Sequence, residues 1–324
     1  MSKVFINETN LTNISNAIRQ KGNTANLLKP NQMGPAIDNI KTNAKLRPTF
    51  ISFQNLLTVQ SINLKKVITD KVKNMDYMFR NCSEVSSLDL SNFNTSNVTT
   101  MGSMFGYCKK LTTLDLSSFD TQKVTNMSNM FDNCINLSSL NISSFNTSSV
   151  TTMGSMFYNC SSLTNLNLSH FDTTKLTQMY SMFSGCSKLI LVNLNNFNTS
   201  KVTNFSSMFY KCSEIKTINI NHFDSSLVTT MSSMFYNCSS LTSLNLSNLS
   251  IPKLTDISSM FYGCSNLTQL DIRKFEFNNI TSYSRYSNMF TGVPNSCKIT
   301  VKSSTEKDWI TSKFSNLTNV VTAS

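Results

Sequence analysis

The residues best able to do chemistry in this sequence are its nine cysteines, which could bind a metal, exchange electrons or form disulfides. Metal and redox sites usually need short pairs such as C-x-x-C, and the sequence has none. The chain begins without the apolar region of a secretion signal, so we expect the thiols to stay reduced. They follow a recurring Met-x-x-Met-Phe-x-x-Cys phrase, which predicts small buried fillers beside flexible methionines.

Histidines and carboxylates form no catalytic set either. His170 and His222 hold the same repeat position two repeats apart, roughly 10 Å at the spacing of stacked strands, and are expected to be solvated. A column of carboxylates is interrupted by asparagine in most repeats, which argues against paired-carboxylate hydrolysis. Its members are Asp89, Asp115 and Asp271 together with Asn63, Asn141, Asn167, Asn193, Asn219 and Asn245. With no P-loop, G-x-S-x-G or zinc spacing, the sequence predicts a protein that is not an enzyme and needs no cofactor or metal.

The elements that position these residues follow from the spacing of the cysteines. Eight of them recur at one constant interval, at positions 82, 108, 134, 160, 186, 212, 238 and 264, and a fixed period of this size is typical of a solenoid. The ninth, Cys297, comes later than position 290, where the same interval would place it, which predicts an insertion in the last coil. A single coil cannot bury its own apolar side chains, so the coils must stack and share one core.

Each coil contains a segment typical of a short inward-facing strand. In the unit LTTLDLSSFDTQKVTNMSNMFDNC, the segment from Leu111 to Leu116 has the L-x-x-L-x-L core of a leucine-rich repeat, and Leu114 and Leu116 should point inward. Nine coils are predicted, beginning at Val59, Val85, Leu111, Leu137, Leu163, Leu189, Ile215, Leu241 and Leu267. The predicted fold is an α/β leucine-rich repeat solenoid with a parallel sheet on one face.

The repeat resembles the BspA-like leucine-rich repeat proteins of bacteria, in the version built on LxxLDLSxFDTSxVTxMxxMFxxC. The match runs from residue 59 to about 290, for instance LDLSNFNTSNVTTMGSMFGYC from Leu88 to Cys108. It departs from the pattern in coil eight, at Leu249, Ile251 and Pro252, and in coil nine, where Tyr283 replaces the expected methionine. The resemblance implies a surface adhesin.

The N-terminal residues 1–45 differ from the repeats and predict a small helical segment. Leu11, Ile14 and Ile18 are spaced as on an amphipathic helix that ends near Gly22. A second helix is expected to begin near Pro30, although Gly34-Pro35 can shorten or break it. The stretch FINETNLTNISNAIRQKGNTANLLKPNQMGPAIDNI resembles the N-terminal segment of structural proteins of phages and prophages of Gram-positive bacteria, which implies attachment to a virion.

Residues 46–58 are expected to connect this segment to the solenoid at 59–297, and residues 298–324 to form a C-terminal cap. The stretch 298–302 predicts a strand, Thr305 to Asp308 a capping box, 309–314 a helix and 319–322 a last strand. A β-α-β cap of this kind would close the exposed end of the sheet, as solenoids require for solubility.

The composition favours an anionic partner. Lys and Arg number 28 against 17 Asp and Glu, which gives a net charge of +11. No run of five to eight Lys or Arg residues is present, and no stretch approaches the roughly 18 apolar residues that cross a bilayer. We therefore expect neither nucleic acid nor a membrane as the partner.

Two columns of equivalent residues are candidates for ligand binding. Lys71, Lys123, Lys175, Lys201 and Lys253 would form a basic stripe, which could be a solubilising surface or could capture a repeating polyanion such as wall teichoic acid. Tyr158, Tyr210, Tyr236 and Tyr262 each follow a Met-Phe pair. These rings could stack on sugars or merely cover the outer side of the coil.

These observations predict a non-enzymatic virion protein of a phage or prophage, made in the host cytoplasm and serving in a tail fibre, baseplate or head fibre. Its expected partners are other virion proteins, through the N-terminal segment, and a host cell-wall polymer or surface protein. The sequence has no heptads for a trimeric stalk. A homo-oligomer in the particle would therefore form through the short segments at the two ends or through the side of the solenoid. The alternatives are a BspA-like cell-surface adhesin and a cytoplasmic scaffold that binds an acidic protein.

Overall fold

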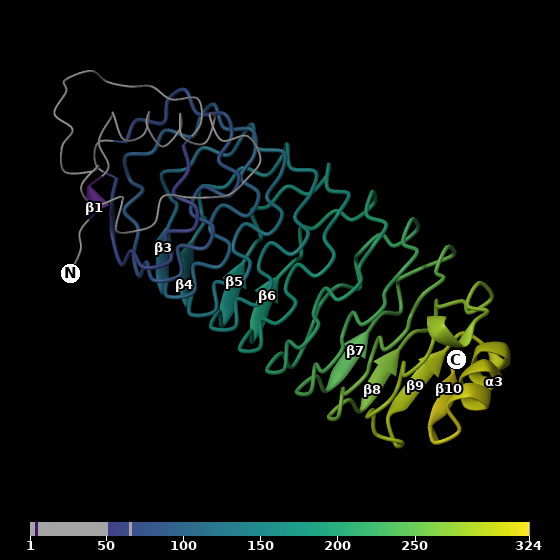
Figure 1. The fold of residues 1–324 in the computed structure, drawn as a ribbon. Coiled ribbons are helices and arrows are strands. Elements are labelled where there is room, and N and C mark those ends of the chain that lie inside the picture. The colour runs from purple at the N-terminus through teal and green to yellow at the C-terminus, as the bar shows by residue number, and fades with distance from the viewer. Residues whose placement is uncertain (1–3, 6–50, 65–66, 324) are drawn as a thin grey trace. The chain divides into compact units, whose positions relative to one another are not determined.

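The computed structural model describes residues 4–5, 51–64 and 67–323, which fall into two compact units, 1–146 (unit 1) and 147–324 (unit 2). Both are built from turns of about 26 residues, so the predicted leucine-rich repeat solenoid with parallel strands is confirmed (Figure 1). The regular turns number about seven rather than nine.

In unit 1, β1 (Val4–Phe5) pairs with β2 (Ile62–Asn63), and β3 (Thr113–Asp115) pairs with β4 (Ser139–Asn141), all in parallel. Strand β3 shows the expected alternation, because Leu114 is buried while its two neighbours are exposed. Residues 4–5 are thus a strand, although residues 1–45 were predicted to be helical. The predicted helices that end near Gly22 and begin near Pro30 lie outside the described residues.

In unit 2, β5 (Asn165–Asn167) pairs with β6 (Leu191–Asn193). A separate four-stranded parallel sheet has the order β10-β9-β8-β7 (Figure 1). Its strands are β7 (Ser243–Asn245), β8 (Gln269–Asp271), β9 (Lys298–Val301) and β10 (Val320–Thr322). The sheet that the sequence predicted as continuous is therefore divided within the described residues, where the equivalent segments 87–89 and 217–219 are not strands.

The Met-x-x-Met-Phe-x-x-Cys phrase folds as a pair of tight turns. In the copy from Met127 to Cys134, Asn129 and Asn133 have φ angles of 56° and 57°, in the left-handed region. The same two positions have positive φ in one repeat after another, and they are filled mostly by Asn, Ser and Gly. Glycine and asparagine adopt this conformation at the lowest cost, so the residues between the apolar ones set the path of the chain.

The apolar residues of the phrase form the core. Phe79, Phe105 and Phe131 in unit 1 are fully buried and stack on one another with ring centroids 5.6 and 5.8 Å apart. Thiols complete the packing by donating hydrogen bonds to phenylalanine carbonyls of the preceding turn, as Cys108 Sγ does to Phe79 O at 3.1 Å. All nine cysteines are buried, which confirms the prediction that they fill space in the core.

A buried column of threonines joins neighbouring turns by paired hydrogen bonds. Thr173 is buried, its Oγ1 donates to Asn198 O at 3.1 Å, and the same oxygen accepts from Asn198 N at 2.7 Å. Equivalent threonines are Thr69, Thr95 and Thr121 in unit 1, and Ser225 continues the column in unit 2. The column ends at Ile251, which has no hydroxyl group. The departure of coil eight from the Asp/Asn-Thr pattern thus coincides with the end of this column.

The predicted β-α-β cap is confirmed, but its helix begins earlier than expected. Helix α3 (Ser304–Lys313) follows the N-cap residue Ser303, whose Oγ accepts from Thr305 N at 3.2 Å and donates to Glu306 Oε2 at 2.6 Å. The capping box is therefore Ser303 to Glu306, and the predicted box from Thr305 to Asp308 was wrong. The indole of Trp309 stacks on Phe277 at 4.4 Å, which anchors the helix to the last turns.

The insertion predicted from Cys297 is present in the last turn. Ser243 pairs with Gln269, and the same interval would pair Gln269 with Asn295, but its partner is Lys298. The lengthened turn contains a short 3-10 helix, η1 (Tyr283–Arg285). Because of this shift, the buried Val293 holds the cysteine position in the last turn and Cys297 lies just before β9. Of the residues described, no helix has the length and apolar character needed to cross a membrane.

Candidate binding surface

The five candidate lysines occupy one repeat position, called here the lysine column. Each is exposed, and each precedes a buried Val or Leu that fixes the backbone against the core. Unit 1 contributes Lys71 and Lys123, whose Nζ donates to Asn97 Oδ1 in the preceding turn at 3.1 Å. Unit 2 contributes three members, of which Lys175 and Lys201 are in consecutive turns. Leu227 separates Lys201 from Lys253.

The lysine column is not neutralised by ion pairs. The ion pairs identified within residues 51–64 and 67–323 are Lys110–Glu84, Arg273–Asp271, Arg285–Asp256 and Lys302–Glu276, and none includes a member of the column. An exposed ammonium group that is not held in an ion pair can bind an anion without first breaking such a contact. The column can therefore bind anions, which is the chemistry expected from the sequence.

Carboxylates lie three residues before some of these lysines and limit the positive potential. Asp172 is exposed, and its Oδ1 accepts from Thr174 N at 2.9 Å and from Thr174 Oγ1 at 2.7 Å. These hydrogen bonds, with a smaller contribution from the positive charge of Lys175, hold the pKa of Asp172 below its usual range. The carboxylate therefore remains charged near neutral pH, and charge alone does not define the ligand.

The tyrosine candidates form a stack rather than an open platform. Tyr210, Tyr236 and Tyr262 are half-buried in unit 2, and their neighbouring ring centroids are 4.6 and 4.5 Å apart. Burial and the two flanking phenols raise the pKa of Tyr236. Tyr158, the fourth candidate, is separated from this stack by a turn with Ser184 at the equivalent position. Because the faces of Tyr236 are covered by its neighbours, the stack is suited to covering the coil and leaves little face for a sugar.

The remaining candidates for chemistry have structural roles. Asp115, in the carboxylate column, accepts hydrogen bonds from Ser117 N at 3.0 Å and from Asn141 Nδ2 at 2.9 Å, so it closes the turn after its strand. His170 and His222 are exposed as predicted, and each lies edge-on to the phenylalanine that follows it. Within the described ranges, no group of His, Cys, Asp and Glu residues is arranged to hold a metal ion.

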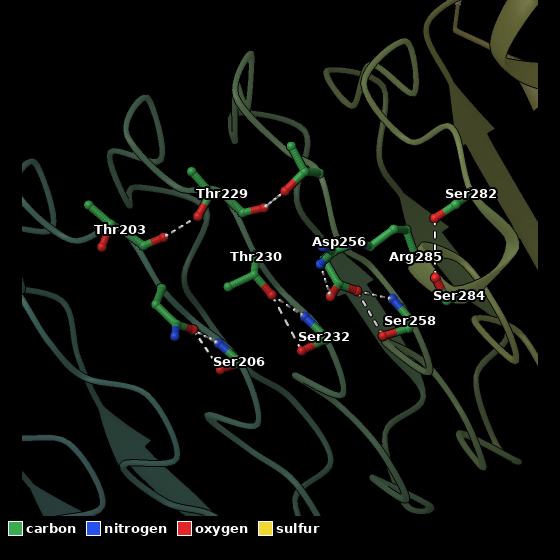
Figure 2. A network of polar contacts seen from close by, with 12 residues as sticks. Thr203, Ser206, Thr229, Thr230, Ser232, Asp256, Ser258, Ser282, Ser284 and Arg285 are labelled. Atoms are coloured by element: carbon green, nitrogen blue, oxygen red, sulfur yellow. Dashed lines mark hydrogen bonds and ion pairs between the residues drawn. The ribbon is translucent and has the colours of Figure 1, made fainter.

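A column of exposed threonines was missed by the sequence reasoning. It lies two residues after the lysine column, in Lys-Val-Thr or Lys-Leu-Thr triplets such as 201–203. The signal was present, because the VT pair recurs in most repeats. The sequence alone does not show that these threonines form hydrogen bonds from one turn to the next, as Thr229 does with Thr203 in Figure 2.

Solved structures that are similar to this chain at low identity include two leucine-rich repeat proteins. A leucine-rich repeat protein from Bacteroides ovatus is 18% identical over 74% of this chain and 79% of its own, with a TM-score of 0.30. The Leptospira interrogans protein LIC12759 is 14% identical over 81% and 64%, with a TM-score of 0.29. The TLR13-ssRNA13 complex is 16% identical over 78% of this chain and 43% of that chain, with a TM-score of 0.27.

No curated protein matches the sequence. A family model described as "Mycoplasma protein of unknown function, DUF285" matches residues 46–139, 108–216 and 189–304. These overlapping matches run from residue 46 to residue 304, well over half of the 324 residues, and they follow the repeats of both units. The chain belongs to the DUF285 family.

Proposed function

We propose that this protein is a non-enzymatic adhesion protein whose lysine column binds an anionic polymer of a cell surface. A leucine-rich repeat solenoid suggests a protein-binding or adhesion role, because its repeats place equivalent side chains at regular intervals over an extended surface. The observation that carries the proposal is the exposure of all five lysines, none of which forms an ion pair with another residue in 51–64 or 67–323. Wall teichoic acid, a repeating polyanion, has the required chemistry.

Binding to purified Gram-positive cell walls tests the proposal. The wild type should bind walls that contain teichoic acid and lose most of its binding when the teichoic acid is extracted. A variant with Lys→Ser at all five positions of the column should bind both preparations weakly. Its matched control carries Lys→Ser at five exposed lysines outside the column: Lys188, Lys216, Lys274, Lys298 and Lys307. The proposal fails if the two variants bind equally well, because net charge alone would then explain adhesion.

We further propose that the protein acts on a phage or prophage virion, with residues 1–45 as the attachment segment. This assignment is supported by the resemblance of that segment to phage structural proteins. Mass spectrometry of purified particles tests it, and absence of the protein from particles would overturn it. Detection on intact cells instead would favour the BspA-like adhesin, and retention in the cytoplasm would favour a scaffold that binds an acidic protein.

A further inference from the structure

The threonines beside the lysine column suggest which polyanion the surface fits. They are exposed, and each is separated from a lysine-column position by one buried residue, as in Lys201-Val202-Thr203. The threonine column is defined here as Thr99 and Thr125 in unit 1 and Thr151, Thr177, Thr203, Thr229 and Thr255 in unit 2. A ligand that lies along the lysines of either unit therefore also passes hydroxyl groups.

The hydrogen atoms of five of these hydroxyls are already engaged, those of Thr99, Thr125, Thr177, Thr229 and Thr255. Thr229 donates from both its backbone N (3.0 Å) and its Oγ1 (3.3 Å) to the carbonyl oxygen of Thr203. Thr255 makes the same pair of bonds to Thr229 O, at 2.8 and 3.0 Å. Thr177 bonds to Thr151 O at 2.9 and 3.0 Å. A hydroxyl has one hydrogen and two lone pairs, so these side chains offer a ligand acceptors rather than donors.

The two columns therefore present different chemistry on the same surface. The ammonium groups of the lysines donate hydrogen bonds and pair with phosphate oxygens. The threonine oxygens need a donor, which a phosphodiester lacks and an alcohol hydroxyl supplies. Resting on the proposed function, we infer that the surface selects polymers in which phosphodiesters alternate with hydroxyl-bearing polyol units, in preference to polyanions without hydroxyl groups.

The alternative of a single-stranded nucleic acid is less well matched to these residues. Such ligands are usually held by aromatic platforms on which successive bases stack. In unit 2 the three consecutive tyrosines stack on each other, at 4.6 and 4.5 Å, which covers both faces of Tyr236 and one face each of Tyr210 and Tyr262. Polyols need no such platform, because their hydroxyls interact through hydrogen bonds.

Competition between two soluble polymers tests the inference. The wild type should bind poly(glycerol phosphate), which has free hydroxyls, about tenfold more tightly than linear polyphosphate of the same charge, as expected for one or two additional hydrogen bonds. The variant T177V/T229V/T255V removes three of the acceptor oxygens of unit 2 and keeps the backbone bonds between turns. Its preference for poly(glycerol phosphate) should fall clearly below that of the wild type, and the control T177S/T229S/T255S should keep the preference. A preference retained in full by the valine variant would overturn the inference.

If the valine variant does not fold, a modified ligand tests the same inference with the wild-type protein. Poly(glycerol phosphate) with its hydroxyls O-methylated keeps its charge and loses its donors, so the wild type should bind it about as weakly as polyphosphate. Equal affinity for the methylated and free polymers would overturn the inference while leaving the lysine column in place. Unchanged binding by the five-lysine variant would instead overturn the proposed function, so the two failures are distinguishable.

Discussion

At the scale of single residues, the fold depends on two backbone positions in each turn that take the left-handed conformation. Gly185 and Gly263 occupy one of them with φ angles of +77° and +70°, and Lys211 occupies the same position with +57°. A side chain there costs roughly 1–2 kcal/mol relative to glycine. The repeat accepts this cost at many turns, which is why asparagine and serine are so frequent in the Met-x-x-Met-Phe-x-x-Cys phrase.

Replacing Gly185 with alanine should destabilise the protein by about 2 kcal/mol, because the left-handed conformation is unfavourable for alanine and the new Cβ would overlap Asn159 Oδ1. Urea denaturation measures the effect. Gly106→Ala is the control, since φ there is not positive and the nearest atom, Ser103 O, lies 3.4 Å from the added Cβ. The control should change stability by no more than about 0.5 kcal/mol. Equal losses in the two variants would contradict this account of the turn.

The buried thiols make stability depend on alkaline pH. Burial raises the pKa of Cys134 from 9.0 to about 12, and it does the same for Cys82, Cys186 and Cys264. Above about pH 9 the unfolded chain loses thiol protons that the folded chain keeps. The unfolded state then binds fewer protons, so the free energy of unfolding falls as the pH rises from about 9 to 12.

A Cys134→Val variant isolates one of these thiols, and Val293 shows that valine fits the equivalent position in the last turn. The urea midpoint of the wild type should fall between about pH 8 and about pH 10.5, and that of the variant should fall less. Tyrosine and lysine also titrate in this range, so the difference between the two proteins is the quantity that counts. Identical pH dependence would show that Cys134 does not contribute.

At the scale of elements, regular features could be predicted and local exceptions could not. The inward strand residues and the Met-Phe-Cys core could be predicted from the constant period, because their pattern recurs many times. The β-α-β cap could be predicted from its strong strand and helix signals. The gaps in the sheet at 87–89 and 217–219 have no such signal, since their sequences match those of the neighbouring strands. Of the candidate surface, the exposed lysine column could be predicted from the repeat, and its role as a binding site stays a prediction. The adjoining threonines could not be recognised from the sequence, because their hydrogen bonds join one turn to the next.

Helix α3 shows how a local signal misleads when two candidates overlap. Both Ser303 to Glu306 and Thr305 to Asp308 have the spacing of a capping box, and the structure uses the first. Ser303→Ala should therefore cost about 1 kcal/mol of stability, because it removes the cap and a hydrogen bond to the buried carboxylate of Glu306. Thr305→Ala serves as the control and should cost no more than about 0.5 kcal/mol. Thermal unfolding of the two variants compares them, and the reverse order would refute this cap.

At the scale of the whole molecule, the proposed function rests on repetition. Each unit stacks turns that share a core, and each presents lysines and threonines at equivalent positions of its turns. Weak contacts along a polymer add up only if the polymer also repeats, so the array favours a repeating ligand over a compact one. In the proposed function, the exposed lysines supply the attraction and the threonine oxygens supply the discrimination.

The salt dependence of binding to purified wall teichoic acid tests the central claim most directly. Lysines that pair with phosphates release counterions, so the wild-type affinity should fall steeply as the salt concentration rises. The variant with Lys→Ser at positions 71, 123, 175, 201 and 253 should bind more weakly at low salt and show a clearly shallower slope. The variant with the five control lysines replaced should keep the wild-type slope. If the column variant binds with the wild-type affinity and slope, the lysine column is not the binding surface.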